Sequence, residues 1–228
     1  MILKTVSQKT IGKPVFLEGV GLHTGSKVKL SFLPAPANTG FIFIRSDLKG
    51  NNQILANVNY VVNTDRGTNI EKNGVKIQTS EHVLAALVGL DIDNCFIEIN
   101  GPEPPIMDGS SKFFIEALET AGIHKQESLR EEYVVSEIIS YKDKETGSEI
   151  TVIPSDEYQV TTMVDFGTKV LGTQNAFLET LGNFKKEISS ARTFSFLHEL
   201  EELLEHGLIK GGDLNNAIVY VDTPPSVS

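Results

Sequence analysis

The sequence predicts an α+β protein built from two related domains, each a mainly antiparallel sheet with helices packed on one face. Three observations lead to this fold class. In each half of the chain, strand-like segments come first and helical segments follow, as in α+β proteins. The 228 residues, 40% of them hydrophobic, suffice for one large or two small domains. A charged run at 124–132 has little to bury, so we expect the boundary there, between domains at 1–126 and 133–228.

The first half opens with two predicted hairpins. Apolar and polar residues alternate over 27–32, a proline-rich break follows, and an apolar run resumes at 41–44. This order predicts a hairpin with a long loop. A sharper hairpin is predicted over 68–77, because Asn73-Gly74 suits a type I′ turn, in which both central residues take positive φ.

Two helices are predicted in the first half. One covers 81–90, where apolar residues recur at helical spacing and Thr79 or Ser80 can cap the N-terminus. A strand over 94–99 comes next. The second helix follows a proline-rich turn and ends near Gly122.

The second half looks like a variation on the same plan. Strand signals run over 133–139, 150–153 and 160–166. A helix is then predicted over 196–205, because its apolar residues lie on one face and its glutamates on the rest. Gly207 is expected to end this helix.

Charge and cysteine content limit the function and the compartment. Twenty Lys and Arg against thirty Asp and Glu give a net charge of −10, which argues against binding a nucleic-acid polymer. The longest apolar stretch, 83–90, is far shorter than the roughly 20 residues of a membrane helix, so no transmembrane segment is expected. The single cysteine, Cys95, and an N-terminus unlike a signal peptide predict a cytoplasmic protein. We also expect a monomer.

The Glu81-His82 pair is the first candidate for chemistry. It opens a predicted helix, and Ala85 and Ala86 leave room beside the imidazole. A helix N-terminus disfavours imidazolium and so favours the neutral ring that a metal ligand needs. From spacing alone, the pattern favours the alternative, a packed histidine beside a surface glutamate, because a Glu-His dipeptide is common. In the loop 105–110, Asp108 is expected to support the turn before the second helix.

Five segments, taken together and in order, resemble the zinc enzyme UDP-3-O-acyl-N-acetylglucosamine deacetylase. That family catalyses the committed step of lipid A synthesis in Gram-negative bacteria. The resemblance covers nearly the whole chain, from Lys4 to Val221. The segments are GVGLHTG at 19–25, PAPANTG at 34–40, SEHVLAAL at 80–87, PIMDGS at 105–110 and ARTF at 191–194.

The resemblance implies a catalytic role for three residues. His82 matches one of three protein ligands to Zn²⁺, and Glu81 matches the general base beside it. In the family, the base takes a proton from zinc-bound water as that water attacks the acetamide carbonyl. Thr193 matches a residue that hydrogen-bonds the developing oxyanion.

The resemblance also implies a binding site for a UDP-acyl-amino-sugar. Asp165, Phe166 and Glu199 match positions that line the sugar and uridine-diphosphate site, and His23 matches a histidine near the nucleotide end. Phe194 would help to form a hydrophobic passage for the acyl chain, with ordinary helix packing as the alternative. The other residues expected in this passage are Phe196, Leu197 and Leu200.

One part of the family pattern has no match. The other two zinc ligands and a catalytic acid histidine come from a later segment resembling H-K-x-x-D-x-x-G-D-L and from a histidine beyond it. No such segment occurs in this sequence. We therefore expect the second domain to be incomplete at its C-terminus, and Zn²⁺ to be held weakly by this chain alone.

The implied reaction is hydrolysis of the N-acetyl group of UDP-3-O-((R)-3-hydroxyacyl)-N-acetylglucosamine, giving a free amine and acetate. Two alternatives stay open at this point. The chain could be an inactive fragment that keeps part of the nucleotide-sugar and acyl-chain surface, or a non-enzymatic interaction domain of similar build. In some bacteria the deacetylase precedes a hydroxyacyl-carrier-protein dehydratase, and the sequence leaves open whether such a domain follows.

Overall fold

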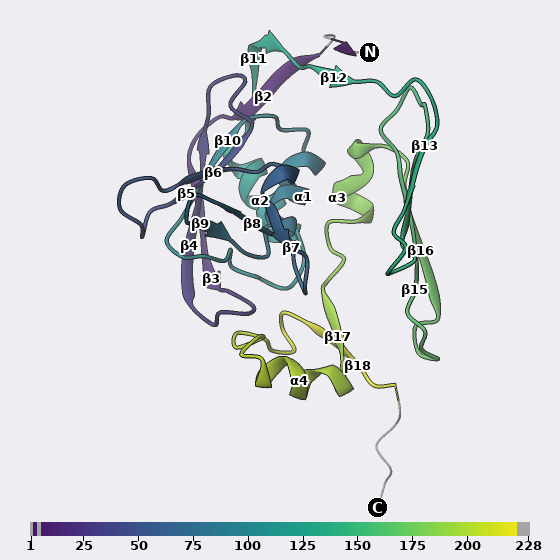
Figure 1. Cartoon of the computed structure of the whole chain (residues 1–228). Helices are drawn as coiled ribbons and strands as arrows, with labels where there is room; N and C mark the ends of the chain where they lie inside the picture. The colour runs from purple at the N-terminus through teal and green to yellow at the C-terminus, as the bar shows by residue number, and fades with distance from the viewer. Residues whose placement is uncertain (1, 4–5, 223–228) are drawn as a thin grey trace, which may run out of the picture.

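The core of the first half is a five-stranded sheet with two helices on one face (Figure 1). The computed structural model describes residues 2–3 and 6–222. Strand β10 lies at the centre of the sheet, antiparallel to β4 and parallel to β5. In spatial order the strands are β3 (Val15–Val20), β4 (Lys27–Pro34), β10 (Cys95–Ile99), β5 (Phe41–Arg45) and β6 (Gln53–Leu55).

The predicted hairpin between 27–32 and 41–44 is wrong, because β10 lies between these two strands. Every second residue of β10, from Cys95 to Ile99, is fully buried, so this strand takes the central position of the sheet. The intervening loop passes over the start of β10 and is fixed by Asn94. The Oδ1 atom of Asn94 accepts hydrogen bonds from the backbone N–H groups of Thr39, at 2.9 Å, and Gly40, at 2.8 Å.

The second predicted hairpin is confirmed. Asn73 and Gly74 both take positive φ, 52° and 81°, and the flanking residues Lys72 and Val75 pair across the turn. The hairpin belongs to a separate three-stranded sheet, which follows a short 3-10 turn at Val58–Tyr60. Its strands are β7 (Val61–Asn63), β8 (Asn69–Lys72) and β9 (Val75–Ile77).

Both predicted helices of the first half are confirmed, as α1 (Glu81–Gly89) and α2 (Lys112–Ala121). Their apolar residues join those of the sheet in one buried cluster, in which the Phe114 ring meets Phe32 edge-on at 6.4 Å between centroids. Ser80 stands at the N-cap of α1, but its hydroxyl donates to the carbonyl of Thr68 rather than capping the helix.

The charged run at 124–132 forms a strand rather than an irregular link. Strand β11 (Ile123–Leu129) pairs antiparallel with β2 (Ser7–Ile11), and β12 (Glu132–Tyr133) pairs with β1 (Ile2–Leu3). Besides its pairing with β2, strand β11 is held to the rest of the fold by side-chain hydrogen bonds rather than by apolar contacts. The Gln126 side chain accepts a hydrogen bond from the Asn94 side chain and donates one to the carbonyl of Ala35. The division into domains at 1–126 and 133–228 stays a prediction.

The second half begins with two antiparallel hairpins (Figure 1). The strand signals over 150–153 and 160–166 are confirmed, but the predicted strand over 133–139 is wrong, because residues 134–138 form no strand. The first joins β13 (Ile139–Lys142) to β14 (Glu149–Val152), and the second joins β15 (Val160–Asp165) to β16 (Thr173–Leu178). A 3-10 turn, Leu181–Asn183, leads into the short helix α3 (Phe184–Glu187). Phe184 is buried in the core cluster of the first half, so α3 connects the two halves of the described chain.

The helix predicted over 196–205 is shorter than expected. Phe196 ends a strand, β17 (Phe194–Phe196), which pairs in parallel with β18 (Ile218–Tyr220). The Phe196 ring packs against Tyr220, with centroids 6.3 Å apart, so a tertiary contact overrides the helical pattern. A 3-10 turn, Leu197–Glu199, leads into α4 (Leu200–Glu205), and Gly207 follows with φ +71°.

These elements confirm the predicted α+β class. Among the described strands, the pairs are antiparallel except β10 with β5 and β17 with β18. No helix in residues 2–3 and 6–222 is long and apolar enough to cross a membrane.

Candidate active site

Glu81 begins helix α1, and its carboxylate is held by the loop that precedes β8. Its Oε2 atom accepts a hydrogen bond of 2.8 Å from the backbone N–H of Thr68. The carbonyl of Thr68 in turn accepts both the N–H and the hydroxyl of Ser80, at 3.1 Å and 2.9 Å. Thr68 therefore donates to Glu81 through its N–H and accepts from Ser80 through its carbonyl. Because both bonds join Thr68 to the start of the helix, the Glu81 carboxylate has a defined orientation.

His82 is partly buried beside two carboxylates. Burial lowers the pKa of His82, and the nearby charges of Glu81 and Asp108 oppose this shift only in part. The imidazole is therefore neutral at physiological pH, which is the form that binds metals. The hydroxyl of Ser111 donates to the His82 carbonyl at 3.1 Å and joins this helix to the start of α2.

Asp108 supports its turn as predicted. Its Oδ1 atom accepts hydrogen bonds from the N–H and the hydroxyl of Ser110, at 3.1 Å and 2.6 Å. The proximity of Asp108 to His82 is a further feature, which the sequence reasoning missed. The sequence does contain one indication that Asp108 lies near His82. Asp108 belongs to the PIMDGS segment, which is part of the same motif pattern as Glu81-His82.

Thr193 is docked on the loop that contains Asp108. The Thr193 N–H donates to the carbonyl of Gly109 at 2.7 Å, and its carbonyl accepts the N–H of Ile218 at 3.0 Å. Beside it, the Nε atom of Arg192 donates to the Asp108 carbonyl at 2.6 Å. The structure thus brings the Thr193 segment to the loop whose Asp108 acts electrostatically on His82.

A cavity of about 270 Å³ joins several of the predicted residues. His23, Thr193 and Phe194 all line it, together with Leu200 at the start of α4. Of the residues predicted to form an acyl-chain passage, Phe194 and Leu200 line this cavity, whereas Phe196 and Leu197 do not. The remaining lining residues are Leu22, Arg66, Ser195, Leu203, Leu204, Ile209, Gly212, Asp213, Leu214, Ala217 and Val219.

His23 is buried and bridges two segments that border the cavity. Its Nδ1 atom accepts the N–H of Ile209 at 3.4 Å, and its Nε2 atom lies 3.2 Å from the carbonyl of Arg66. Since a carbonyl can only accept, these bonds assign the ring proton to Nε2. The ring orientation therefore depends on both neighbouring segments.

Glu199 forms an ion pair with Arg66, a residue that sequence reasoning missed. The Oε1 atom of Glu199 lies 2.7 Å from Nη2 of Arg66, while its Oε2 atom accepts from the N–H of Phe196 and the hydroxyl of Ser195. The Arg66 hydrogen bond is the main cause of the lowered pKa of Glu199. Glu199 does not line the cavity itself, but its partner Arg66 does.

Phe166 and Asp165 lie at the end of β15 and differ in their surroundings. The Phe166 ring meets the Phe194 ring edge-on at 5.3 Å between centroids, so it adjoins the cavity wall. Asp165 is exposed and accepts the N–H of Gly167 at 3.0 Å. The structure brings Phe166 to the other predicted residues and leaves Asp165 outside the cavity lining.

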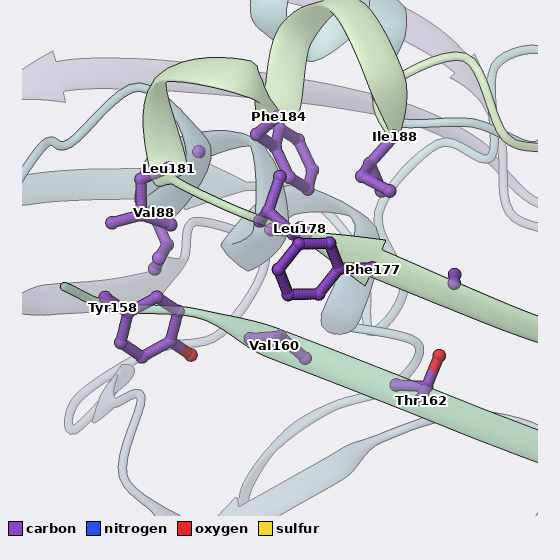
Figure 2. Close-up of a pocket in the computed structure, with 12 residues that line it drawn as sticks. Val88, Tyr158, Val160, Thr162, Phe177, Leu178, Leu181, Phe184 and Ile188 are labelled. Atoms are coloured by element: carbon purple, nitrogen blue, oxygen red, sulfur yellow. The ribbon is translucent and has the colours of Figure 1, made fainter. Parts of the chain in front are cut away.

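A second cavity of about 270 Å³ lies between α1, α3 and the β15–β16 hairpin. Figure 2 shows Phe177 and Leu178 between α3 and strand β15, with Val160 on β15 itself and Phe184 and Ile188 on the α3 side. Its lining is almost wholly apolar and includes none of the predicted site residues. It is therefore a packing feature between the two halves rather than a candidate for polar chemistry.

The described residues supply part of a metal site. His82 is a nitrogen donor in the right protonation state, and carboxylates lie near it. In residues 2–3 and 6–222, however, no group of three His, Cys, Asp or Glu side chains could hold a metal ion. The residues thus fit zinc in kind but do not make a complete ligand set.

Comparison with known proteins agrees with the motif pattern. Residues 8–226 match the family described as UDP-3-O-acyl N-acetylglycosamine deacetylase (LpxC). The chain is 46% identical over 218 residues to the bifunctional enzyme LpxC/FabZ of Chlorobaculum tepidum, covering 95% of this chain and 47% of that protein. It is 44% identical over 217 residues to the bifunctional enzyme LpxC/FabZ of Bacteroides thetaiotaomicron, with the same coverage of 95% and 47%.

A shorter relative is the UDP-3-O-acyl-N-acetylglucosamine deacetylase of Myxococcus xanthus. It is 40% identical over 215 residues, which cover 93% of this chain and 68% of that protein. The chain therefore spans about half the length of the bifunctional relatives and about two thirds of this one. The match over residues 8–226 and these identities establish that the chain belongs to the UDP-3-O-acyl N-acetylglycosamine deacetylase family.

Proposed function

We propose that the protein hydrolyses the N-acetyl group of UDP-3-O-((R)-3-hydroxyacyl)-N-acetylglucosamine, the committed step of lipid A synthesis. The products are acetate and the free amine. Family membership supports this reaction. The observation that carries it is the docking of Thr193 on the Gly109 carbonyl, next to Asp108, whose charge acts on His82. This docking supports a site in which Glu81 and Thr193, which are far apart in sequence, act together.

In this proposal Glu81 is the general base. Its carboxylate takes a proton from the attacking water, and the Thr68 N–H holds it in the orientation for that step. Thr193 donates a hydrogen bond to the oxygen that gains negative charge as the acetamide carbonyl becomes tetrahedral. The backbone of Thr193 is fixed on both sides, by Gly109 and Ile218, which supports a defined position for this residue.

His82 is proposed as one ligand to Zn²⁺. Its low pKa supports this role, since a ligating imidazole must be neutral. When bound, zinc would polarise the carbonyl and lower the pKa of a bound water from 15.7 to about 7. Because the described residues give an incomplete ligand set, we derive no step through the metal.

The cavity beside Thr193 is proposed to take the acyl chain. Its apolar walls, among them Phe194 and Leu200, suit a hydrocarbon. Its volume, about 270 Å³, lies just below the range of about 300–1,000 Å³ for ligand sites, so it would hold one part of a larger substrate. His23 and Glu199 are proposed to bind the nucleotide-sugar portion, together with Phe166 and Asp165 at the end of β15.

We further propose that the protein acts in the cytoplasm, as a monomer and without a nucleic-acid partner. The net charge of −10 supports the last point, because a polyanion would be repelled. A local cationic group such as Arg66 is compatible with binding a single diphosphate.

The test is acetate release by the whole protein, supplied with zinc and the UDP-acyl-amino-sugar. Glu81→Gln keeps the shape of the side chain and removes the base, so we expect kcat to fall by about 10²- to 10⁴-fold. Glu71→Gln, at an exposed position of strand β8, is the matched control and should leave kcat unchanged. A wild-type protein that releases no acetate, or a Glu81→Gln variant with full activity, would overturn the proposal.

A further inference from the structure

Glu103 is the one carboxylate among the described residues that is fully buried, and the proposed reaction gives it no role. It lies between β10 and α2, in the proline-rich turn before PIMDGS. Within residues 6–222, no Lys, Arg or His side chain forms an ion pair with it. A buried charge without a counterion is costly unless hydrogen bonds compensate it, so its partners identify what it does.

Three donors from two segments converge on the Glu103 carboxylate. The N–H of His23 lies 3.0 Å from Oε1 and 3.1 Å from Oε2, and the N–H of Thr24 donates to Oε2 at 2.8 Å. The hydroxyl of Thr79 donates to Oε1 at 3.0 Å. One segment contains His23, at the cavity, and the other leads directly into Glu81 and His82.

Gly21 shows how closely the His23 turn approaches Glu103. A Cβ atom on Gly21 would lie 2.6 Å from Oε2 of Glu103 and would overlap the hydroxyl of Thr24. Any side chain at this position would push the turn away from the carboxylate. The second glycine of the GVGLHTG segment is therefore explained by Glu103 and not by a phosphate-binding loop.

Thr79 shows that the second segment is held under strain. Its φ is +49°, in the left-handed region that β-branched residues rarely adopt, at a cost of about 1–3 kcal/mol. Such a conformation persists only where neighbouring contacts enforce it. Here the contacts are the hydrogen bond to Glu103 and one from the Thr79 N–H to Asn69 Oδ1, at 3.2 Å. Helix α1 starts just two residues later, with Glu81.

We propose that Glu103 is a positioning residue that fixes His23 relative to the Glu81-His82 pair. Its carboxylate holds the His23 turn through two backbone amides and the entry to α1 through the Thr79 hydroxyl. In the proposed function, on which this inference rests, the nucleotide end and the reacting end of the substrate are thereby kept at one distance. Displacement by about 1 Å can cost an enzyme about 100-fold in rate.

The test uses variants of the whole protein that change one hydrogen bond at a time. Thr79→Val keeps the shape and branching of the side chain but removes the hydroxyl, and Thr79→Ser keeps the hydroxyl. Glu103→Gln replaces one accepting carboxylate oxygen by an NH₂ group, which is itself a donor and cannot accept the backbone N–H groups of His23 and Thr24. The matched control is Thr10→Val, which removes another buried hydroxyl, the acceptor of the Ala35 N–H at 3.0 Å, far from the site.

A positioning role predicts a change in the folded enzyme, not only in its stability. At a temperature where all variants are folded, Thr79→Val and Glu103→Gln should lower kcat/KM by about 10- to 100-fold. Thr79→Ser should restore it, and Thr10→Val should lose stability while keeping kcat and KM. The ¹⁵N and ¹H signals of the His23 ring should shift in Thr79→Val, because both residues are hydrogen-bonded to the Glu103 carboxylate.

The outcomes separate this inference from the proposed function. Wild-type kinetics together with an unshifted His23 ring in Thr79→Val and Glu103→Gln would overturn the positioning role. A wild-type protein without acetate release would overturn the proposed function, while the His23 signals would still decide whether Glu103 links the two segments. Should Glu103→Gln fail to fold, Thr79→Val and Thr79→Ser decide the question.

Discussion

Gly89, in the last turn of α1, lies directly against the ring of Phe184 in α3. A Cβ atom on Gly89 would lie 2.6 Å from Cγ of that ring, closer than real contacts allow. This contact connects the helix that carries Glu81 and His82 to the second half of the chain. It also adjoins the apolar cavity drawn in Figure 2.

We expect Gly89→Ala to destabilise the protein. Alanine gains about 1 kcal/mol over glycine in a helix, but overpacking a core costs about 1–3 kcal/mol, so the two effects oppose each other. Because the overlap is with a buried ring, we expect the packing cost to prevail and the free energy of unfolding to fall by about 1 kcal/mol. Urea denaturation measures it.

A second substitution isolates the cause of that loss. If the overlap with the ring is responsible, adding Phe184→Ala to Gly89→Ala should cost less than Phe184→Ala does in the wild-type chain. Strictly additive free energies, or a Gly89→Ala variant more stable than wild type, would show that α3 moves aside freely.

Gly109→Ala should disturb Thr193. Gly109 has φ +87°, and a Cβ there would overlap the carbonyl oxygen of Asn216, while its own carbonyl accepts the Thr193 N–H. The control is Gly122→Ala, with φ +73°, ψ 156° and nothing within 4 Å, which isolates the cost of a conformation that only glycine readily adopts, about 1–3 kcal/mol. We expect Gly109→Ala to lose more stability than this control and also to lower kcat. Equal losses of stability with unchanged kcat would refute this.

The Arg66–Glu199 ion pair should give stability that depends on pH. Because the pKa of Glu199 is lowered in the folded state, its contribution is present above the unfolded value, about 4.3, and is lost as pH falls through the folded pKa. The side chains are 44% and 22% exposed, so the contribution should lie within about 0.2–1 kcal/mol.

The measurement compares wild type with Glu199→Gln in urea denaturation from roughly pH 3 to pH 7, a range that spans the pKa of an unfolded glutamate, about 4.3. The difference in free energy of unfolding should be largest at neutral pH and should shrink in acid and in about 1 M salt. Lys142–Glu149, an exposed pair at 3.6 Å, serves as the control, and Glu149→Gln should change the free energy of unfolding by little. A difference between wild type and Glu199→Gln that is independent of pH would contradict the role of this pair.

Cys95 should be unreactive in the native protein. It is fully buried in β10, and burial raises the pKa of its thiol to about 12. The thiolate is the nucleophile, so a disulfide reagent at pH 8 should label the thiol only as fast as the protein opens. Labelling in urea gives the reference rate. Native labelling at the rate of the unfolded chain would place Cys95 at an accessible surface, against the fold described.

The elements that could be predicted from the sequence are those determined by residues close together in the chain. The apolar spacing in α1 and the Asn73-Gly74 turn are local signals, and both are confirmed. The insertion of β10 between β4 and β5 is a pairing over long range, which adjacent strand patterns cannot indicate. The helix predicted to begin at Phe196 was wrong there for the same reason, because Phe196 contacts Tyr220 in a strand that is distant in sequence.

The candidate site divides in a similar way. The motif pattern pointed to Glu81, His82 and Thr193, while Arg66 and Glu103 escaped notice because neither has a distinctive local sequence. In the sequence, Glu103 is only one residue of a proline-rich turn, and the structure is needed to show its three hydrogen-bond donors. Arg66 reads as a loop cation until its guanidinium meets Glu199. Asp165 is exposed beyond the cavity, and its binding role stays a prediction.

The most direct test of the account is acetate release by the whole protein carrying His82→Ala, measured beside His124→Ala. Losing a zinc ligand should cost at least the 10- to 100-fold that outer-shell changes cost, so we expect His82→Ala to lower kcat by about 100-fold or more and to bind less zinc. His124 is exposed on β11, and its variant should match wild type. Acetate release by His82→Ala at the wild-type rate, with undiminished zinc, would contradict the central claim.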